Sequence, residues 1–180
     1  MARGATLVQF DIDLSDVDRG VYESLSFPAA QHPSESGVYL VARVLAYALE
    51  YAEGIAFTRG LSSGDEPAIQ ICDLTGRMHD WIEVGTPEGP RLHKASKAAD
   101  RVAVYCHKDA RDWLRGLARE RVHDSENIEL FALPPEGIEA LAQQVERRNT
   151  WSLSRIEGTL YLDVGEVHTE LAVERLAWPA

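Results

Sequence analysis

Apolar and polar residues alternate along several stretches of the chain. In the first of them, Val8, Phe10, Ile12 and Leu14 stand at every second position, which places all four on one face of an extended chain. Such alternation predicts strands with one buried face. The strands predicted in this way lie towards the two ends of the chain, at 5–14, 21–27, 150–156, 159–164 and 169–178.

The middle of the chain carries helical periodicity instead. Residues 32–53 repeat apolar side chains every three or four positions on adjacent stripes, so this helix is predicted to be largely buried. The apolar segments 101–106 and 127–132 flank a predicted helix at 109–121, which predicts two parallel strands joined by a right-handed crossover. Further helices are predicted at 91–100 and 134–147, and residues 55–61 fit either a short strand or an extended lead-in.

The order of these elements predicts the fold class. Strands at both ends, with helices and strands alternating between them, indicate an α/β fold whose mixed β-sheet is flanked by helices. No internal repeat, low-complexity run or linker divides the sequence. We therefore expect one domain that spans residues 1–180.

Residues 64–85 predict a β-hairpin near the centre of the chain. Both arms carry side chains suited to a sheet, and Thr75-Gly76 supplies the turn between them. Neighbouring antiparallel strands bring facing side chains into contact. The expected register pairs Cys72 with His79 and Ala68 with Glu83.

This register gathers carboxylates at one end of the hairpin. Asp65 and Glu66 begin the first arm, and Glu83 stands near the end of the second arm. Oxygen ligands of this kind are what Mg²⁺ or Mn²⁺ requires. The structural alternative for Asp65-Glu66 is a polar loop before Pro67, whereas an acid inside a strand, such as Glu83, needs a reason to be there.

Charge is distributed unevenly. The net charge of −11 over 180 residues argues against a general nucleic-acid binder. Residues 77–121, however, hold 10 basic and 7 acidic side chains, a net charge of +3, directly after the hairpin acids. A local positive surface of this kind suits a phosphate-bearing ligand. The alternative, given equal weight, is that Arg111, Arg115, Arg119 and Arg121 form a solvated helix face.

Composition also bears on the compartment. Cys72 and Cys106 fall inside predicted strands, and we expect them to be buried reduced thiols, as in a cytosolic protein. No apolar run is long enough to span a membrane, and the first residues lack the apolar block of a signal peptide. The sequence thus predicts a cytoplasmic location without membrane association.

Five short motifs lie along the chain: His32-Pro33-Ser34-Glu35, Phe57-Thr58-Arg59-Gly60-Leu61, Asp65-Glu66-Pro67, Trp81-Ile82-Glu83-x-Gly85 and Lys94-Ala95. Together they resemble the motifs of the YaeQ family of bacterial proteins. Their order and spacing match over nearly the whole chain, which makes the set specific although each motif alone is weak. The resemblance implies a fold like that of the PD-(D/E)xK nucleases, the restriction-endonuclease-like fold, with extra N- and C-terminal strands.

The nuclease pattern implies a role for specific residues. By this resemblance Glu35, Asp65, Glu66 and Glu83 would bind Mg²⁺ or Mn²⁺, and Asp65, Glu83 and Lys94 would be catalytic. The pattern places a lysine two residues after the second acid, where this chain has Gly85. Lys94, on the next predicted helix, would have to supply the missing ammonium. Its structural alternative is an ordinary solvated helix stripe, and that of Glu35 is a helix-dipole residue.

Two classes of function follow. The first is a metal-dependent phosphodiesterase of the PD-(D/E)xK type that acts on nucleic acid, in which the metal polarises the phosphodiester and helps to activate water. The second is a nuclease-like domain without catalysis, which serves as a binding or regulatory module with a protein partner. One fold hosts many functions, so the fold does not decide between them.

Overall fold

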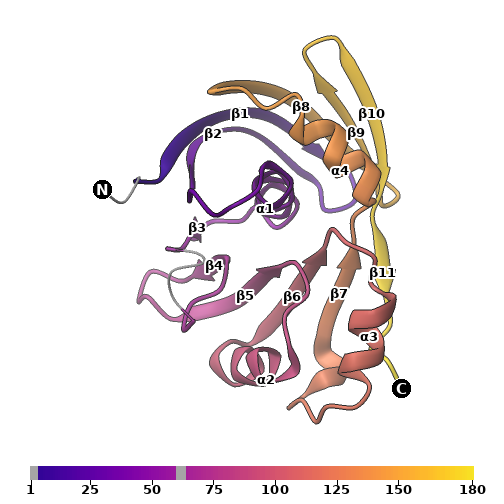
Figure 1. The fold of residues 1–180 in the computed structure, drawn as a ribbon. Helices are drawn as coiled ribbons and strands as arrows, with labels where there is room; N and C mark the ends of the chain where they lie inside the picture. The colour runs from indigo at the N-terminus through magenta and orange to yellow at the C-terminus, as the bar shows by residue number, and fades with distance from the viewer. Residues whose placement is uncertain (1–3, 60–63) are drawn as a thin grey trace. The chain divides into compact units, whose positions relative to one another are not determined.

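The computed structural model describes residues 4–59 and 64–180, which form two compact units, each built around its own mixed β-sheet (Figure 1). Unit 1 comprises residues 1–44 and 133–173, and unit 2 comprises 45–132 and 174–180. The expected α/β class, with mixed sheets and flanking helices, is confirmed. The strands nevertheless form two sheets where one was expected.

The five-stranded sheet of unit 1 joins the two ends of the chain. Its strand order is β10-β9-β8-β1-β2, and only the β1–β8 pair is parallel. The predicted alternation of β1 is confirmed, since Phe10 and Ile12 are buried, and the Phe10 ring packs on those of Phe27 and Trp151. The strands are β1 Thr6–Asp16, β2 Val21–Gln31, β8 Arg148–Ile156, β9 Thr159–Val164 and β10 Val167–Ala172.

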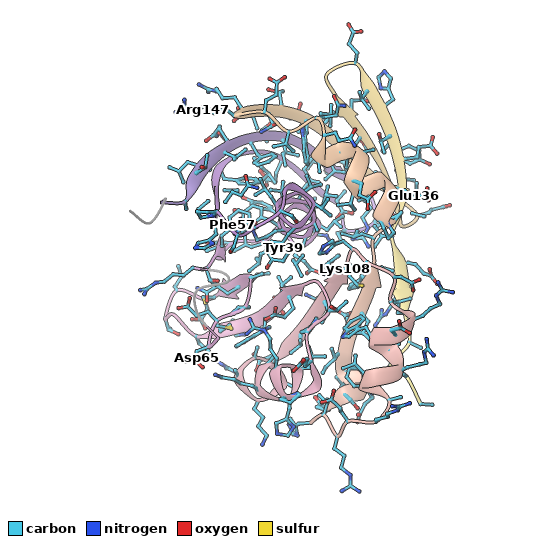
Figure 2. The ribbon with its side chains drawn as sticks, in the orientation of Figure 1. Tyr39, Phe57, Asp65, Lys108, Glu136 and Arg147 are labelled. Atoms are coloured by element: carbon cyan, nitrogen blue, oxygen red, sulfur yellow. The ribbon has the colours of Figure 1, made fainter. Side chains whose placement is uncertain are left out.

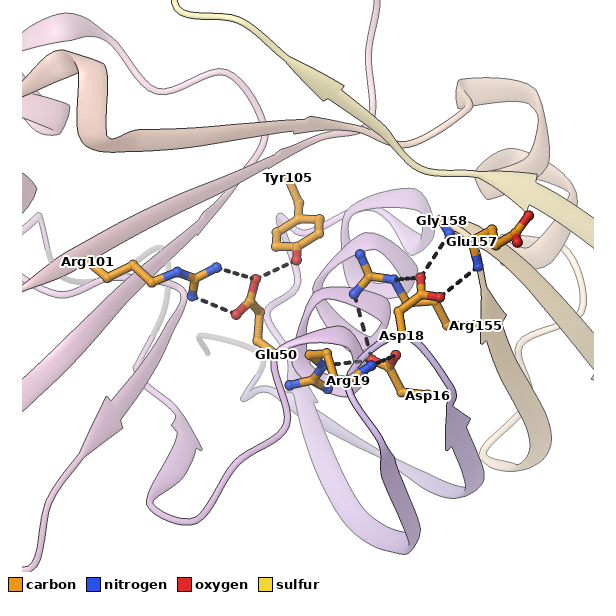
Figure 3. A network of polar contacts seen from close by, with 9 residues as sticks. All are labelled: Asp16, Asp18, Arg19, Glu50, Arg101, Tyr105, Arg155, Glu157 and Gly158. Carbon is orange, nitrogen blue, oxygen red and sulfur yellow. Dashed lines mark hydrogen bonds and ion pairs between the residues drawn. The ribbon is translucent and has the colours of Figure 1, made fainter.

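Carboxylates fix the turns of this sheet (Figure 3). Asp18 accepts hydrogen bonds from the amides of Glu157 and Gly158 at 2.7 and 2.9 Å. Both residues have positive φ, 49° and 75°, as the turn predicted between β8 and β9 requires. Fully buried Asp16 accepts from the Arg19 guanidinium at 2.7 Å, so the β1–β2 turn is also held by a charge-assisted bond.

The six-stranded sheet of unit 2 has the order β11-β7-β6-β5-β4-β3. β5, β6 and β7 are parallel, which confirms the predicted crossover between 101–106 and 127–132. Helices α2, Gly89–Ala98, and α3, Arg111–Leu117, pack on one face of these strands. The strands are β3 Ile55–Phe57, β4 Ile69–Cys72, β5 Met78–Val84, β6 Arg101–Cys106, β7 Ile128–Ala132 and β11 Glu174–Leu176.

The first helix is shorter than the prediction of 32–53. α1 spans Gly37–Leu49, because Ser36 is its N-cap: the Ser36 hydroxyl accepts a hydrogen bond from the Tyr39 amide at 3.1 Å. Glu35 therefore precedes the helix and is not in its first turn. The last helix, α4, spans Pro135–Ala142 rather than 134–147.

The predicted hairpin is present, with one error in its register. Ile69 pairs with Ile82 and Ile71 with Asp80, as expected, but a bulge after Ile71 pairs Cys72 with Met78 and not with His79. The turn explains the shift, because Asp73 Oδ1 accepts from the amides of Thr75 and Arg77 at 2.8 and 3.1 Å. These hydrogen bonds lengthen the turn by one residue relative to the prediction. The alternation of apolar and polar residues does not reveal such a change.

The two cysteines were expected to be buried reduced thiols. Both are free thiols, and Cys106 is buried while Cys72 is half-buried.

Two predicted segments differ in part from the structure. The segment 55–61 begins with β3, but Gly60 and Leu61 of the motif lie outside the described residues. The stretch 169–178 divides at Val173 between β10 and β11, which belong to different sheets. No helix within 4–59 and 64–180 is long and apolar enough to cross a membrane.

Candidate functional site

Glu83 is the buried acid of the candidate site. It lies on β5 with only 5 % of its surface exposed, two residues after fully buried Trp81 on the same face of the strand. Its Oε1 accepts hydrogen bonds from the Trp81 indole Nε1 at 2.7 Å and from Arg91 Nε at 2.8 Å. Burial raises the pKa of Glu83, and the neighbouring guanidinium and indole only partly offset this. The site thus holds a desolvated carboxyl group with two oriented donors.

Arg91 joins this carboxyl group to the acidic loop. The residue lies in the first turn of α2, and its guanidinium donates to the carbonyl oxygens of Gly64 and Glu66 at 3.1 and 2.7 Å. Its central carbon lies 5.7 Å from the centre of the Trp81 ring. One side chain therefore contacts β5 and the loop at 64–66 at the same time.

Lys94 contacts Asp65. One helical turn separates Arg91 from Lys94, so both side chains leave the same side of α2. The Lys94 ammonium forms an ion pair with the Asp65 carboxylate and lowers its pKa. Figure 2 labels Asp65, whose side chain is 84 % exposed, and such exposed pairs contribute little to stability. Lys94 is therefore held beside Asp65 loosely enough to be displaced.

A divalent metal ion needs several oxygen ligands around one point. Glu66 Oε2 is buried and has no hydrogen-bond partner among the described residues, a state that is costly for a carboxylate. Oxygen donors of this type suit Mg²⁺ or Mn²⁺. Within 4–59 and 64–180, however, no group of three or more His, Cys, Asp or Glu side chains is spaced to hold a metal. The acids fit such an ion in kind, but fewer than three of the described ones are gathered at one place.

Glu35, the fourth predicted ligand, belongs to unit 1. It is buried, its Oε1 pairs with Arg43 Nη2 at 2.9 Å, and its Oε2 accepts from the His32 amide at 3.2 Å. Burial raises the pKa of Glu35, although Arg43 and His32 oppose this shift. The structure thus brings Lys94 to Asp65, and it brings Arg91 to Glu83 and to the Glu66 carbonyl oxygen. A shared site of Glu35, Asp65, Glu66 and Glu83 stays a prediction.

Arg91 is the site residue that the sequence-based reasoning missed. Because Gly85 stands where the nuclease pattern has a lysine, Lys94 was proposed as its replacement. Arg91 stands three positions earlier, just after the Pro/Gly-rich loop. Two cations three apart on one helix share a face, and this spacing was the available signal. Arg91 also supplies the pairing that a strand acid such as Glu83 needs.

The predicted positive segment is largely neutralised by its own acids. Arg77 pairs with Asp100 at 2.7 Å, and Arg111 and Arg115 pair with Asp109 and Asp112. Lys97, Lys108, Arg119 and Arg121 are exposed. A solvated helix face is thus the favoured interpretation for Arg111 and Arg115 on α3. The positive charge near the site lies mainly on α2.

A second polar network supports the other face of the unit 2 sheet (Figure 3). Glu50, next to the end of α1, accepts from Arg101 Nη1 at 2.7 Å and from the Tyr105 hydroxyl at 2.5 Å. Arg101 Nε also donates to Glu129 at 2.6 Å. These bonds tie β6 and β7 to Glu50 and leave no charge of the cluster unpaired, so we assign the network to structure.

The fold and the site define an α/β protein with an acidic hairpin that faces two cations on a helix. The family model described as "YaeQ protein" matches residues 1–173, and the chain therefore belongs to the YaeQ family. This confirms the family suggested by the sequence motifs.

Relatives support the same assignment over the full fold. The chain is similar to "Uncharacterized protein YaeQ" of Escherichia coli (strain K12), with 29 % identity over 99 % of this chain and 98 % of that protein. The crystal structure of YaeQ protein from Pseudomonas syringae superposes with a TM-score of 0.89 at 34 % identity, covering 96 % of each chain. YaeQ protein from Xanthomonas axonopodis pv. citri gives 0.87 at 29 % identity, covering 97 % and 99 %.

Proposed function

We propose that the protein is a metal-dependent phosphodiesterase of the PD-(D/E)xK type that acts on nucleic acid. The observation that carries the proposal is the contact between Lys94 and Asp65, beside Glu83 and its partner Arg91. A nuclease of this class needs two acids and a lysine in one place. Lys94 provides the ammonium that Gly85 lacks, from the neighbouring helix.

Each residue has a role in this proposal. Asp65, Glu66 and Glu83 would hold Mg²⁺ or Mn²⁺, which when bound polarises the phosphodiester and lowers the pKa of a water molecule. An exposed ion pair opens at little cost, so Lys94 is free to leave Asp65 and turn towards an incoming phosphate. There its ammonium would stabilise the charge that develops in the transition state.

A second function is favoured by a different contact. Glu83 is already neutralised by Arg91 and bonded by Trp81, an arrangement that would be complete without any metal. A non-catalytic binding or regulatory module would use these bonds only to shape the hairpin end.

The two functions are separated by a cleavage assay. Single-stranded and duplex DNA and RNA are incubated with the protein and Mg²⁺ or Mn²⁺, and products are followed by gel. In the enzyme, Lys94→Ala is expected to reduce cleavage by about 10²- to 10³-fold, the usual effect of losing one electrostatic contact in the transition state. Mn²⁺ affinity should stay similar or rise slightly in this variant, since a like charge has been removed.

The controls decide how each outcome is interpreted. Lys97→Ala removes an exposed cation from the same helix and should leave cleavage unchanged. Glu83→Ala should abolish it. Cleavage that survives both Lys94→Ala and Glu83→Ala would belong to a contaminant or another site, and wild-type protein without cleavage or Mn²⁺ binding would favour the non-catalytic module.

A further inference from the structure

Arg91 contacts the polypeptide on both sides of Asp65 as well as Glu83. The carbonyl oxygen of Gly64 precedes Asp65, that of Glu66 follows it, and both accept from the same guanidinium. We propose that Arg91 is a positioning residue that sets Asp65 against Glu83, so that the two acids serve one ion. The metal-binding part of this inference rests on the proposed function.

The geometry of the guanidinium explains why the side chain is an arginine. Nε and Nη2 lie 2.8 and 2.7 Å from Glu83 Oε1, while Nη1 and Nη2 reach the two carbonyl oxygens. A planar fork of donors makes all these contacts at once, whereas an ammonium is a single point of charge. A lysine at this position would keep the charge and lose the bridge.

The surroundings fix the direction of the bridge. Trp81 is fully buried and donates to the same Glu83 oxygen, so the Glu83 end of the bridge belongs to the core of unit 2. Gly64 and Asp65, at the other end, are exposed. The rigid strand β5 therefore positions the exposed loop, through Arg91, and not the reverse.

The first test measures Mn²⁺ affinity calorimetrically in three variants. Arg91→Gln and Arg91→Lys should both weaken binding by about 10- to 100-fold, the usual cost of losing a group that orients metal ligands. Lys97→Gln, which removes a charge from the same helix, should bind as tightly as wild type. If Arg91 acted only through its charge, Arg91→Gln would bind more tightly and Arg91→Lys would match wild type, and either result would overturn the proposal.

The second test needs no metal. Endoproteinase Asp-N cleaves before aspartate, and the rate of cleavage at Gly64–Asp65 reports how often this loop opens. Loss of two hydrogen bonds should raise that rate about tenfold or more in Arg91→Gln and Arg91→Lys, relative to Lys97→Gln. Thermal melting of each variant identifies any global unfolding, and cleavage before Asp112 provides an internal reference.

The two tests distinguish the two ideas. Wild-type protein that binds no Mn²⁺ overturns the metal-dependent function, while faster loop cleavage in folded Arg91 variants still supports the positioning role. Unchanged cleavage at Gly64–Asp65 in those variants overturns the positioning role whatever the metal does. If Arg91→Gln does not fold, Glu83→Gln tests the same bridge from its other end and should also raise the cleavage rate.

Discussion

At the scale of single residues, the acids of the site differ sharply in their surroundings. Glu83 is buried, has a raised pKa and is bonded to Trp81 and Arg91, whereas Asp65 is exposed, has a lowered pKa and is paired with Lys94. Burial disfavours the charged form, and an adjacent cation favours it. The two carboxyl groups would therefore respond differently to any ligand, since only Asp65 can exchange its partner at little cost.

Trp81 offers a direct test of how the buried acid is supported. Trp81→Ala should lower the free energy of unfolding by about 3–5 kcal/mol, because a fully buried ring is removed. Trp81→Phe keeps most of the packing and removes the indole donor to Glu83, so the expected loss is about 1–3 kcal/mol. Urea unfolding measures both values. Equal stability of wild type and Trp81→Ala would contradict the buried position.

His79 joins two carboxylates beside the hairpin turn. Its Nδ1 lies 2.8 Å from Asp100 Oδ2 and its Nε2 lies 3.0 Å from Asp73 Oδ2. Hydrogen bonds to Asp73 and Asp100 raise the pKa of His79 above 6.5, and the pKa values of both acids are lowered from 3.8. The imidazolium is thus the central charge of an exposed cluster.

The stability of the protein should depend on the pH through this cluster. The raised pKa of His79 contributes stability that is fully present below about pH 6.5 and is lost as the pH rises through the folded-state pKa. Wild type should therefore lose thermal stability as the pH rises above about 6.5, and His79→Gln should lose less. His123→Gln, at another exposed histidine, is the control. An identical pH dependence in wild type and His79→Gln would exclude the imidazolium as the source.

At the scale of elements, the approach of β3 to β4 depends on one glycine. Gly54 has a φ of +88°, and its carbonyl oxygen accepts from the Cys72 amide at 3.2 Å. A Cβ at this position would lie 2.0 Å from the Cys72 carbonyl oxygen, which is a backbone atom and cannot rotate away. The bulge of the hairpin at Cys72 therefore packs directly on the residue that begins the β3 segment.

Gly54→Ala is expected to lower the free energy of unfolding by about 2 kcal/mol or more, because it combines a positive φ with a backbone clash. Gly116→Ala is the matched control. Gly116 lies inside α3 with open space around it, and alanine is the better helix former, so this change should be neutral or stabilising by up to about 1 kcal/mol. Thermal unfolding compares the two, and a Gly54→Ala midpoint at or above that of Gly116→Ala would contradict the predicted clash.

At the scale of the whole molecule, the sequence predicted elements better than their ends and partners. The alternation of β1 and the apolar run of β6 gave correct strands, because a period of two and a buried parallel strand are local signals. The predicted start of α1 was wrong, since the prediction relied on Pro33 and Glu35 and overlooked Ser36 as the N-cap. Division of the strands into two sheets depends on pairings between distant segments, which no local pattern records.

The candidate site shows the same division between local and distant information. The hairpin register predicted that Asp65 lies near Glu83, and the family motif pointed to Lys94, which does pair with Asp65. The role of Arg91 depends on the carbonyl oxygens of Gly64 and Glu66, whose direction follows from loop conformation and not from residue type. The direction in which a backbone carbonyl group points cannot be read from a sequence, and for this reason the Arg91 bridge was not predicted.

The crossing of the chain at Val173, from β10 to β11, has a consequence for synthesis on the ribosome. β11 pairs with β7 and covers its edge, although more than forty residues separate Ala132 from Glu174. A nascent chain that has already formed β3 to β7 would leave the β7 edge exposed until residues 174–176 emerge, and an open edge invites pairing with other chains. Stop codons placed just before Glu174 should therefore yield aggregated product.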